Sequence, residues 1–376
     1  MKSRRAFSGL ASPGFYYFIG LVFTLILAAC GSDNDHSLAK ALEKIRTQQK
    51  VPAVAGAIVA NGGLSEAAVA GVRKSDDSTR VTVDDQFHLG SNTKAMTAYL
   101  AAMFVDAGQL SFETKILSVF PEMVTSADPG YQDVTVAHLL AHRAGLNDDE
   151  LIAAYGDDLP DTLALPDQRA WVVEKVLSTP PSNVGNYAYS NLGYILAGAI
   201  LERRSGNSWE DLIQTRLFEP LGMDSAGFGP PGTPGALDQP WGHQLEGTQI
   251  IPSQIDNPKI YGPAGRVHCS IGDWAKFIQE FMNCLRGETA LVSAANCEKI
   301  ATPWPGGDYG FGWQVVSTNG VTVLLHDGSN DYFYSLAVVN PAINTAILAA
   351  TNIGGDRGAL AVNAVIQELA GRVDQD

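Results

Sequence analysis

Residues 87–98 read FHLGSNTKAMTA and carry the strongest structural signal in the chain. Residues 95–105 overlap the end of this stretch and are apolar on nearly every side of a helix. Because this run stops before Gly108, it predicts a buried helix ended by glycine. Ser91 then lies at the N-terminus of this helix, and Lys94 lies three residues further on, over the same face. The spacing predicts that the Lys94 amine reaches the Ser91 hydroxyl.

A serine and a lysine in this arrangement can act as a nucleophile and its base. Burial lowers the pKa of a lysine, so a neutral amine can take the serine proton, while the helix N-terminus favours developing negative charge. The alternative is a serine that only caps the helix beside a solvent-facing lysine, since S-x-x-K occurs by chance in many sequences. The pair is a candidate catalytic centre that needs partners elsewhere in the chain.

Two later segments supply candidate partners. Y-S-N at residues 189–191 precedes an apolar helical run, which places Tyr189 in a loop or turn that enters a helix. H-D-G-S at residues 326–329 ends a predicted strand. Each segment therefore presents polar side chains at the end of a secondary-structure element.

The motifs S-x-x-K, Y-x-N and H-x-G, in this order, resemble those of the serine β-lactamase and penicillin-binding-protein superfamily. The resemblance is greatest to the class C β-lactamase-like group, which includes D-alanyl-D-alanine peptidases, D-aminopeptidases and family VIII carboxylesterases. Other segments similar to the family extend the resemblance over about residues 40–370. These segments are residues 134–146, 219–223, 262–265, 273–274 and 309–313.

The resemblance implies catalytic roles for three residues. Ser91 would be the acylated nucleophile and Lys94 its base. Tyr189 would pass the proton to the leaving group and help to activate the deacylating water. No cofactor is implied, and the reaction would be hydrolysis through an acyl-enzyme.

The resemblance also implies a set of substrate-binding groups. The Asn191 amide would hold a substrate carbonyl, and His326 would line the cleft opposite the tyrosine. The backbone N–H groups of Ser91 and Ser329 would form the oxyanion hole beside Gly328, where they would stabilise a tetrahedral intermediate.

The third motif departs from the K-T-G of β-lactamases. In H-D-G, a titratable imidazole (His326) replaces a fixed cation, and Asp327 replaces a hydroxyl with a potential anion. Asp327 would repel the carboxylate of a penicillin or of a D-Ala-D-Ala peptide if it faced the cleft, but alternate residues of a strand face opposite sides. Arg266 could supply a replacement cation or form an ordinary salt bridge. Neutral esters are therefore at least as plausible as β-lactams.

Strand-like segments gather at both ends of the chain. Residues 53–60 and 66–72 flank N-G-G and predict a hairpin. Residues 311–317, 321–325, 332–340 and 344–352 predict four more strands, and residues 358–372 a final helix. This pattern predicts an α+β fold of the β-lactamase/transpeptidase-like type, with an antiparallel sheet from both termini flanked by helices. Residues 37–107 and 257–376 would form the α/β lobe and residues 108–256 a mainly helical inserted lobe, with the site in the cleft between them.

The N-terminal segment resembles a lipoprotein signal. Residues 1–29 have a basic start and then an uncharged run, and the sequence L-A-A-C ends at Cys30, which would be lipidated. Residues 30–36 would form a polar tether. An ordinary signal peptide or an uncleaved signal anchor is the alternative. Each reading predicts export, and the lipobox predicts a periplasmic lipoprotein anchored to the membrane.

Composition limits the other classes of function. The 25 Lys and Arg against 40 Asp and Glu give a net charge of −15, which disfavours nucleic acid as a partner. His138 and His142 lack the glutamate of an H-E-x-x-H zinc motif, so no metal site is expected. An oxidising compartment would allow one disulfide and one thiol among the remaining cysteines, without indicating the pair. These cysteines are Cys269, Cys284 and Cys297.

The sequence thus predicts an exported serine hydrolase that forms an acyl-enzyme on Ser91. Its substrates would be β-lactams, esters, D-amino-acid amides or peptidoglycan-derived molecules. Two alternatives stay open: a carboxylesterase without β-lactamase activity, and a non-catalytic lipoprotein that binds the cell wall.

Overall fold

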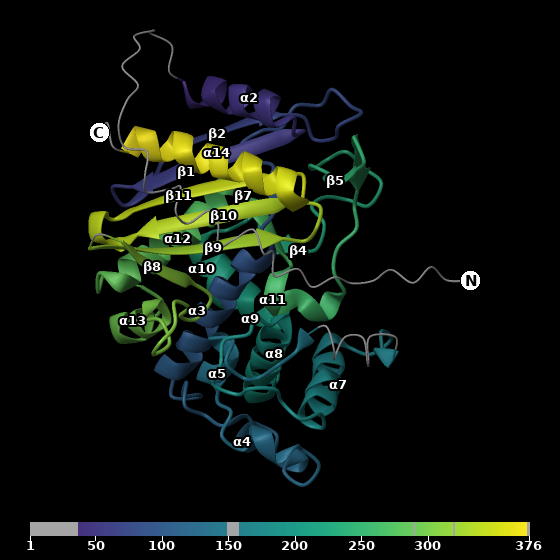
Figure 1. Cartoon of the computed structure of the whole chain (residues 1–376), viewed down its shortest axis with the longest axis vertical. Coiled ribbons are helices and arrows are strands. Elements are labelled where there is room, and N and C mark those ends of the chain that lie inside the picture. The colour runs from purple at the N-terminus through teal and green to yellow at the C-terminus, as the bar shows by residue number, and fades with distance from the viewer. Residues whose placement is uncertain (1–36, 149–157, 289, 319, 374–376) are drawn as a thin grey trace.

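The computed structural model describes residues 37–148, 158–288, 290–318 and 320–373 (Figure 1). The predicted signal peptide, the tether and Cys30 lie outside these residues. Within the described ranges, no helix is both long and apolar enough to cross a membrane.

A six-stranded antiparallel sheet joins the two ends of the chain in the order β2-β1-β11-β10-β9-β8. Strand β1 from the N-terminal part pairs directly with β11 from the C-terminal part. The structure therefore confirms the α+β class and the predicted sheet built from both termini. The strands are β1 (Ala53–Ala60), β2 (Gly63–Gly71), β8 (Gln314–Thr318), β9 (Val321–Ser329), β10 (Tyr334–Asn340) and β11 (Thr345–Thr351).

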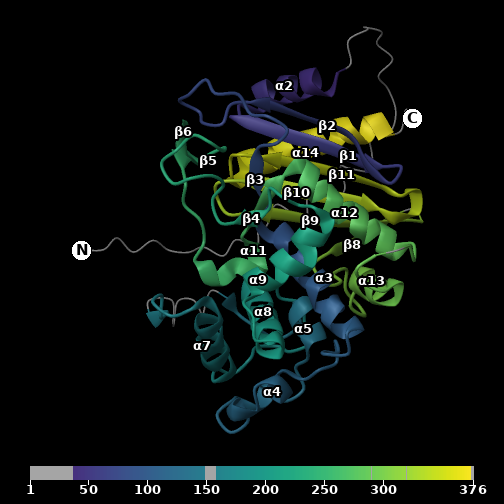
Figure 2. The same cartoon turned by 180° about the vertical axis from the view of Figure 1, so that it is seen from behind.

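Helices cover both faces of this sheet, which explains why β1 is apolar along its whole length. On β1, Val54 and Ile58 pack toward helices α2 (Leu38–Gln49) and α14 (Gly355–Val373). The alternate residues of β1 pack into the main core on the other face, with helices α3 (Thr93–Asp106), α12 (Ile271–Leu285) and α13 (Ala294–Ala301). Figures 1 and 2 show α14 and α12 on opposite sides of the sheet.

The helical part lies below the sheet in Figure 1, around α8 (Asn191–Ser205), which is buried along most of its length. Its other helices are α4 (Ile116–Val119), α5 (Val136–Leu140), α7 (Leu165–Leu177), α9 (Trp209–Ile213) and α10 (Glu219–Leu221). A short helix, α11 (Gly262–Gly265), packs between α8 and α3. Single turns of 3-10 helix or π-helix occur at Gly90–Asn92, Pro121–Met123, Pro129–Tyr131, Gln214–Phe218, Lys259–Tyr261 and Pro341–Ile343.

Two small sheets complete the fold. Strand β7 (Val267–Ser270) lies between β3 (Gln86–His88) and β4 (Gly227–Phe228), and β5 (Gly242–Glu246) forms a hairpin with β6 (Gln249–Ser253). The N–H of His243 in this hairpin donates to the Tyr332 carbonyl, so the hairpin lies against the sheet rather than among the helices. The lobe boundaries at residues 107 and 256 stay a prediction.

The structure shows which two of the three described cysteines form the disulfide, a choice that the sequence left open. Cys284 of α12 and Cys297 of α13 form a disulfide, and Cys269 of β7 is a buried free thiol. The bond ties α13 to α12, and α12 packs on the core side of the sheet.

Candidate active site

Ser91 lies where two backbone segments touch. It sits in the 3-10 turn Gly90–Asn92 that leads into α3, and its side chain is partly exposed. Gly90 has φ +51°, and a Cβ there would lie 2.3 Å from the Ser329 nitrogen. A Cβ on Gly328 would lie 2.7 Å from the Ser91 nitrogen. Only glycines allow this approach, which brings the two predicted oxyanion donors to one place.

Lys94 is fully buried on the first turn of α3 and contacts Ser91 as predicted. Its Nζ lies 3.0 Å from Ser91 Oγ, 2.7 Å from Asn191 Oδ1 and 2.7 Å from the Ala264 carbonyl oxygen. An amide oxygen and a carbonyl oxygen can only accept hydrogen bonds. A neutral Lys94 amine therefore donates its two hydrogens to Asn191 and Ala264 and presents its lone pair to the serine hydroxyl.

The electrostatics of the site favour that neutral amine. Burial lowers the pKa of Lys94 from 10.5 to about 7, against the opposing influence of the Asp148 and Asp327 carboxylates. An amine with this pKa is about half deprotonated at neutral pH. The arrangement can therefore accept the Ser91 proton without a histidine base.

Tyr189 completes the contact around the serine oxygen. Its hydroxyl donates to Ser91 Oγ at 2.7 Å, and Lys94 Nζ lies 4.8 Å from the centre of its ring. Burial raises the pKa of Tyr189 well above 10, although the hydrogen bond with Ser91 opposes that shift. Tyr189 thus stays a phenol and holds a proton beside the nucleophile.

Asn191 begins α8, and a carboxylate that sequence reasoning missed fixes its position. Asp148 accepts hydrogen bonds from the Ser190 hydroxyl and from the Asn191 N–H, both at 2.5 Å. A carboxylate at a helix N-terminus satisfies unpaired N–H groups and complements the helix dipole. The only signal was an Asn-Asp-Asp run after Leu146, far from residues 189–191 in sequence. Because Asn191 Oδ1 accepts the hydrogen bond from Lys94 Nζ, the NH₂ group of Asn191 is directed away from Lys94.

His326 lies on the same face of β9 as the main core. It pairs across the sheet with Ala337 of that core, and its Nε2 accepts from the Tyr309 hydroxyl at 2.8 Å. Its Nδ1 contacts the Asp327 carbonyl oxygen at 2.5 Å, so Nδ1 carries the hydrogen. Burial lowers the pKa of His326 to about 4. The imidazole is therefore neutral at physiological pH, and its partner Tyr309 begins the segment 309–313 that resembles the family.

Asp327 points to the opposite face of β9. It pairs with Leu336, which packs under α14, and its Oδ2 accepts from the Tyr334 hydroxyl at 2.6 Å. The question left open by the sequence is answered by strand alternation, because the carboxylate lies on the side away from His326.

Arg266 is engaged in an ion pair and a backbone hydrogen bond. Its Nε lies 3.3 Å from an Asp256 oxygen, and its NH1 donates to the Asn257 carbonyl at 2.5 Å. The salt-bridge alternative for Arg266 is the one that the structure shows.

His138 and His142 have separate structural partners. His138 Nδ1 contacts the Thr135 hydroxyl at 2.9 Å at the start of α5. His142 is buried, accepts the Ser190 N–H at 3.1 Å, and packs its ring 4.4 Å from that of Tyr189. In the described part of the chain, no three His, Cys, Asp or Glu side chains are grouped so that they could hold a metal ion.

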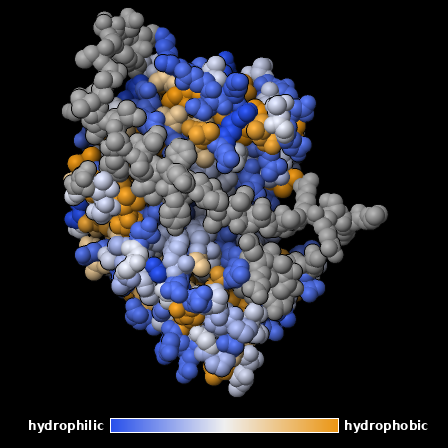
Figure 3. Space-filling view, in the orientation of Figure 1, coloured by the Kyte–Doolittle hydropathy of each residue, from blue (hydrophilic) through white to orange (hydrophobic). Residues whose placement is uncertain are grey.

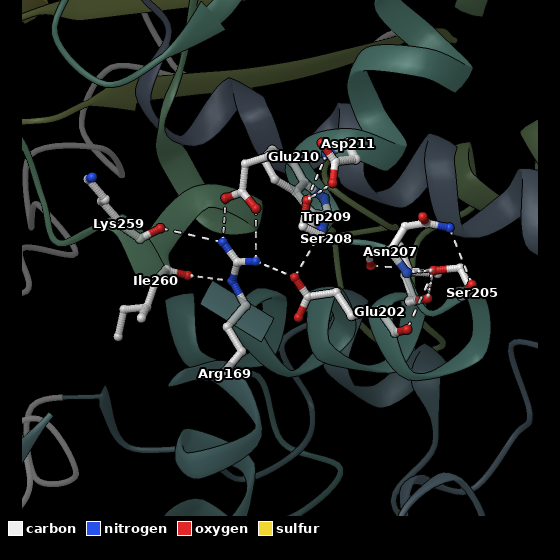
Figure 4. A network of polar contacts seen from close by, with 11 residues as sticks. Arg169, Glu202, Ser205, Asn207, Ser208, Trp209, Glu210, Asp211, Lys259 and Ile260 are labelled. Carbon is white, nitrogen blue, oxygen red and sulfur yellow. Dashed lines mark hydrogen bonds and ion pairs between the residues drawn. The ribbon is translucent and has the colours of Figure 1, made fainter. Parts of the chain in front are cut away.

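The Ala264 carbonyl that accepts from Lys94 follows a segment fixed by a buried arginine (Figure 4). Arg169 of α7 donates from Nε to the Ile260 carbonyl at 3.1 Å and forms ion pairs with Glu202 and Glu210. The two glutamates belong to α8 and α9, so Arg169 joins these helices to the segment that enters α11. The position of the lysine therefore depends on packing in the helical part.

A buried lysine, a serine and a tyrosine in mutual contact beneath an antiparallel sheet indicate a serine hydrolase. The sequence matches the Beta-lactamase family over residues 38–371, and the chain belongs to that family. It is 30% identical over 332 residues to penicillin-binding protein 4 of Amycolatopsis lactamdurans, covering 83% of this chain and 84% of that protein. It is 27% identical over 293 residues to an unguisins hydrolase of Aspergillus campestris, covering 73% of this chain but only 54% of that protein.

Solved structures show the same fold. The class C β-lactamase of Rhodobacter sphaeroides superimposes with a TM-score of 0.70 at 19% identity, covering 90% of this chain and 100% of that one. The D-amino acid amidase of Ochrobactrum anthropi gives a TM-score of 0.70 at 20% identity, and the match covers 90% of this chain and 99% of the amidase chain. The predicted β-lactamase-like fold and family are thus confirmed, and the chain is a serine hydrolase of the β-lactamase and penicillin-binding-protein superfamily.

Proposed function

We propose that this hydrolase forms an acyl-enzyme on Ser91 and acts on esters or amides that carry no carboxylate beside the scissile bond. The observation that carries the proposal is the fully buried Lys94, whose amine contacts the Ser91 hydroxyl at 3.0 Å and has a pKa of about 7. Lys94 takes the serine proton as Oγ attacks the carbonyl. Tyr189, which contacts the same Ser91 oxygen, passes this proton on to the leaving group and later helps to activate the deacylating water.

The N–H groups of Ser91 and Ser329 receive the negative charge that develops on the carbonyl oxygen. Asn191, whose Oδ1 accepts from Lys94, directs its NH₂ group to a substrate carbonyl. His326, Gly328 and Ser329 form the wall of the substrate site on β9.

The choice of neutral substrates rests on the charge of that wall. A penicillin or a D-Ala-D-Ala peptide presents a carboxylate, which K-T-G enzymes meet with a fixed cation. Here the corresponding His326 is a neutral imidazole hydrogen-bonded to Tyr309, and Arg266 is paired with Asp256. This favours a carboxylesterase or a neutral-amide hydrolase over a β-lactamase.

Export belongs to the same proposal. The basic and apolar segment before Cys30 would direct the chain across the inner membrane, and lipidation of Cys30 would then anchor the mature protein to a membrane facing the periplasm. Small molecules or peptidoglycan-derived molecules of the periplasm would then be its substrates.

Active-site labelling tests the nucleophile. A fluorescent fluorophosphonate should label the wild-type protein, and Ser91→Ala should lose both labelling and ester hydrolysis while unfolding at the same temperature. A wild-type protein that neither a fluorophosphonate nor a fluorescent penicillin modifies would favour the non-catalytic cell-wall-binding alternative.

A substrate panel tests the specificity. Short p-nitrophenyl esters should be hydrolysed with a kcat/KM well above that for nitrocefin or a D-Ala-D-Ala peptide. Faster turnover of nitrocefin than of the esters would contradict the assignment of neutral substrates and leave the nucleophile assignment intact.

A further inference from the structure

Asp256 lies outside the three motifs, yet it contacts both backbone segments that meet at Ser91. Its side chain is only 2% exposed. Its contacts are His88 Nε2 at 3.1 Å, Arg266 Nε at 3.3 Å and Asn330 Nδ2 at 3.0 Å. Residue 88 is three positions before the nucleophile, and residue 330 directly follows the second predicted oxyanion donor.

The link to the nucleophile turn passes through His88. The Gly90 N–H donates to His88 Nδ1 at 3.1 Å, so this nitrogen is unprotonated and the ring hydrogen is on Nε2. Nε2 therefore donates to Asp256. Since both ring nitrogens are engaged, this histidine–carboxylate pair holds the backbone of the turn and is not a relay to the Ser91 hydroxyl.

The link to the strand passes through Asn330. Its Nδ2 donates to Asp256, while its Oδ1 accepts the N–H groups of Tyr332 at 3.2 Å and Phe333 at 2.9 Å. These bonds fix the turn between β9 and β10 at the residue after Ser329. One buried carboxylate thus connects the backbones that carry the two N–H donors.

The chemistry of these contacts requires a carboxylate. His88 Nε2, Arg266 Nε and Asn330 Nδ2 all donate, so the group among them must accept on both of its oxygens. An asparagine would place an NH₂ group against a donor and lose at least one link. Burial raises the pKa of Asp256, but His88, Arg266 and Asn330 together hold it below its usual value.

We propose that Asp256 is a positioning residue that sets the spacing of the oxyanion hole by binding His88 on the nucleophile turn and Asn330 at the end of β9. This proposal rests on the acyl-enzyme function proposed above. Preorganised donors act through their fixed geometry, and loss of one donor typically costs about 10²–10³ in kcat. A carboxylate that fixes two donors at once should therefore influence the rate without touching the substrate.

The test is Asp256→Asn, measured with a short p-nitrophenyl ester and with an arylboronic acid, which forms a tetrahedral anion on the serine. We expect kcat to fall about 10- to 100-fold with little change in KM, since a displaced donor loses part of the effect of a deleted one. Boronic acid affinity should fall by a similar factor. The pH at half-maximal kcat/KM should stay unchanged, because Lys94 keeps its contacts.

Glu280→Gln is the matched control. Glu280 of α12 is a buried carboxylate outside the motifs, and one of its oxygens accepts from the Tyr99 hydroxyl and the Leu291 N–H. A glutamine retains that oxygen, so this variant should keep wild-type kcat and boronic acid affinity. An equal loss in both variants would indicate general destabilisation and overturn the positioning role.

His88→Asn is the milder variant if Asp256→Asn does not fold. Asparagine can place Oδ1 where His88 Nδ1 accepts from the Gly90 N–H, while the bond to Asp256 is lost. The His88→Asn variant should therefore lose affinity for the boronic acid as Asp256→Asn does. If wild type is labelled and active but both variants bind the boronic acid as wild type does, only this inference fails; if wild type is never acylated, the proposed function fails.

Discussion

Lys94 shows how one residue acquires a chemistry that it lacks in water. The free energy of burying an ammonium is reduced here by contacts with Ser91, Asn191 and Ala264, yet burial still dominates and lowers the pKa to about 7. A serine hydroxyl needs a base that is neutral at working pH, and general bases contribute about 10²–10⁴-fold to the rate. Burial at the start of α3 therefore gives Lys94 the neutral amine that the proposed base requires.

The pH dependence of acylation follows from this shift. Because the pKa of Lys94 is lowered from 10.5 to about 7, the fraction of neutral amine rises as pH increases through 7. We expect kcat/KM for a neutral ester to rise with pH and to reach half its maximum near pH 7. Initial rates between pH 5 and pH 9 measure this profile.

His326→Gln is the control for that profile. The pKa of His326 is about 4, so the imidazole is already neutral across the measured range. The variant should change the maximum rate but not the pH of half-maximal activity. Loss of the rise in His326→Gln would show that histidine, and not Lys94, is the titrating base.

The charge of residue 326 should control substrate choice. His326→Lys places an ammonium where K-T-G enzymes have one, and a charge-assisted hydrogen bond to a substrate carboxylate contributes about 1.5–3 kcal/mol. We expect KM for nitrocefin to fall about 10- to 100-fold relative to a neutral ester. Steady-state kinetics on both substrates check this.

Asp327→Ser is the matched variant on the neighbouring position. In the wild type, the Asp327 carboxylate accepts a hydrogen bond from the Tyr334 hydroxyl on the face of β9 opposite His326. Removing this carboxylate should therefore leave the ratio of nitrocefin to ester activity nearly unchanged. A large gain of nitrocefin turnover in Asp327→Ser would contradict the orientation of this side chain.

At the scale of elements, the site forms where an irregular turn meets a strand end. The turn Gly90–Asn92 and strand β9 approach so closely that Cβ atoms at Gly90 and Gly328 would collide with backbone atoms of the other segment. The sequence showed both glycines within motifs, but the reason for them lies in a contact between segments more than two hundred residues apart. Strand alternation on β9 then places His326 and Asp327 on opposite faces of the sheet. The sequence alone left open which of the two faces Asp327 occupies.

The disulfide between α12 and α13 should contribute to stability and not to catalysis. Cys284 and Cys297 are 13 residues apart, and closing a loop of this size stabilises a fold by about 3 kcal/mol. The double variant Cys284→Ala, Cys297→Ala should lower the free energy of unfolding by about that amount in urea. Fluorophosphonate labelling of Ser91 at low temperature should remain, and a loss of labelling in the folded variant would contradict a purely structural role.

At the scale of the whole molecule, local patterns predicted the elements but not their long-range partners. The hairpin around Asn61-Gly62 was predictable because hairpin turns require positive φ and an Asn-Gly pair adopts it readily. In the structure both residues have positive φ. Ser91, Lys94 and Tyr189 were predictable as a group through the family resemblance, and the structure brings them together.

The residues that support the motifs were not predictable. Asp148 and Asp256 bind side chains that lie 42 and 74 positions away in the sequence, and no local pattern marks either residue. The Ala264 carbonyl is a backbone group, so its residue type carries no signal at all. Such partners are defined only when packing fixes which segments meet.

The surface charge bears on how the protein would be held at a membrane. Acidic residues exceed basic ones by 15, and the face in Figure 3 is largely hydrophilic with separate hydrophobic areas. An acidic surface is repelled by anionic lipids, so electrostatic attraction would not retain the protein. Acyl chains on Cys30 would do so, because each buried CH₂ contributes about 0.8 kcal/mol.

Cys30→Ser should therefore release the protein. In the native host, wild type should sediment with membranes, stay there after a high-salt wash and incorporate labelled palmitate. Cys30→Ser should lose the palmitate label and appear in the soluble fraction if another peptidase cleaves the signal, whereas Cys269→Ala, which alters only the buried thiol, should behave as wild type. Intact-mass measurement separates the alternatives: membrane-bound Cys30→Ser that retains residues 1–29 would identify an uncleaved signal anchor, and wild type without palmitate would exclude the lipoprotein.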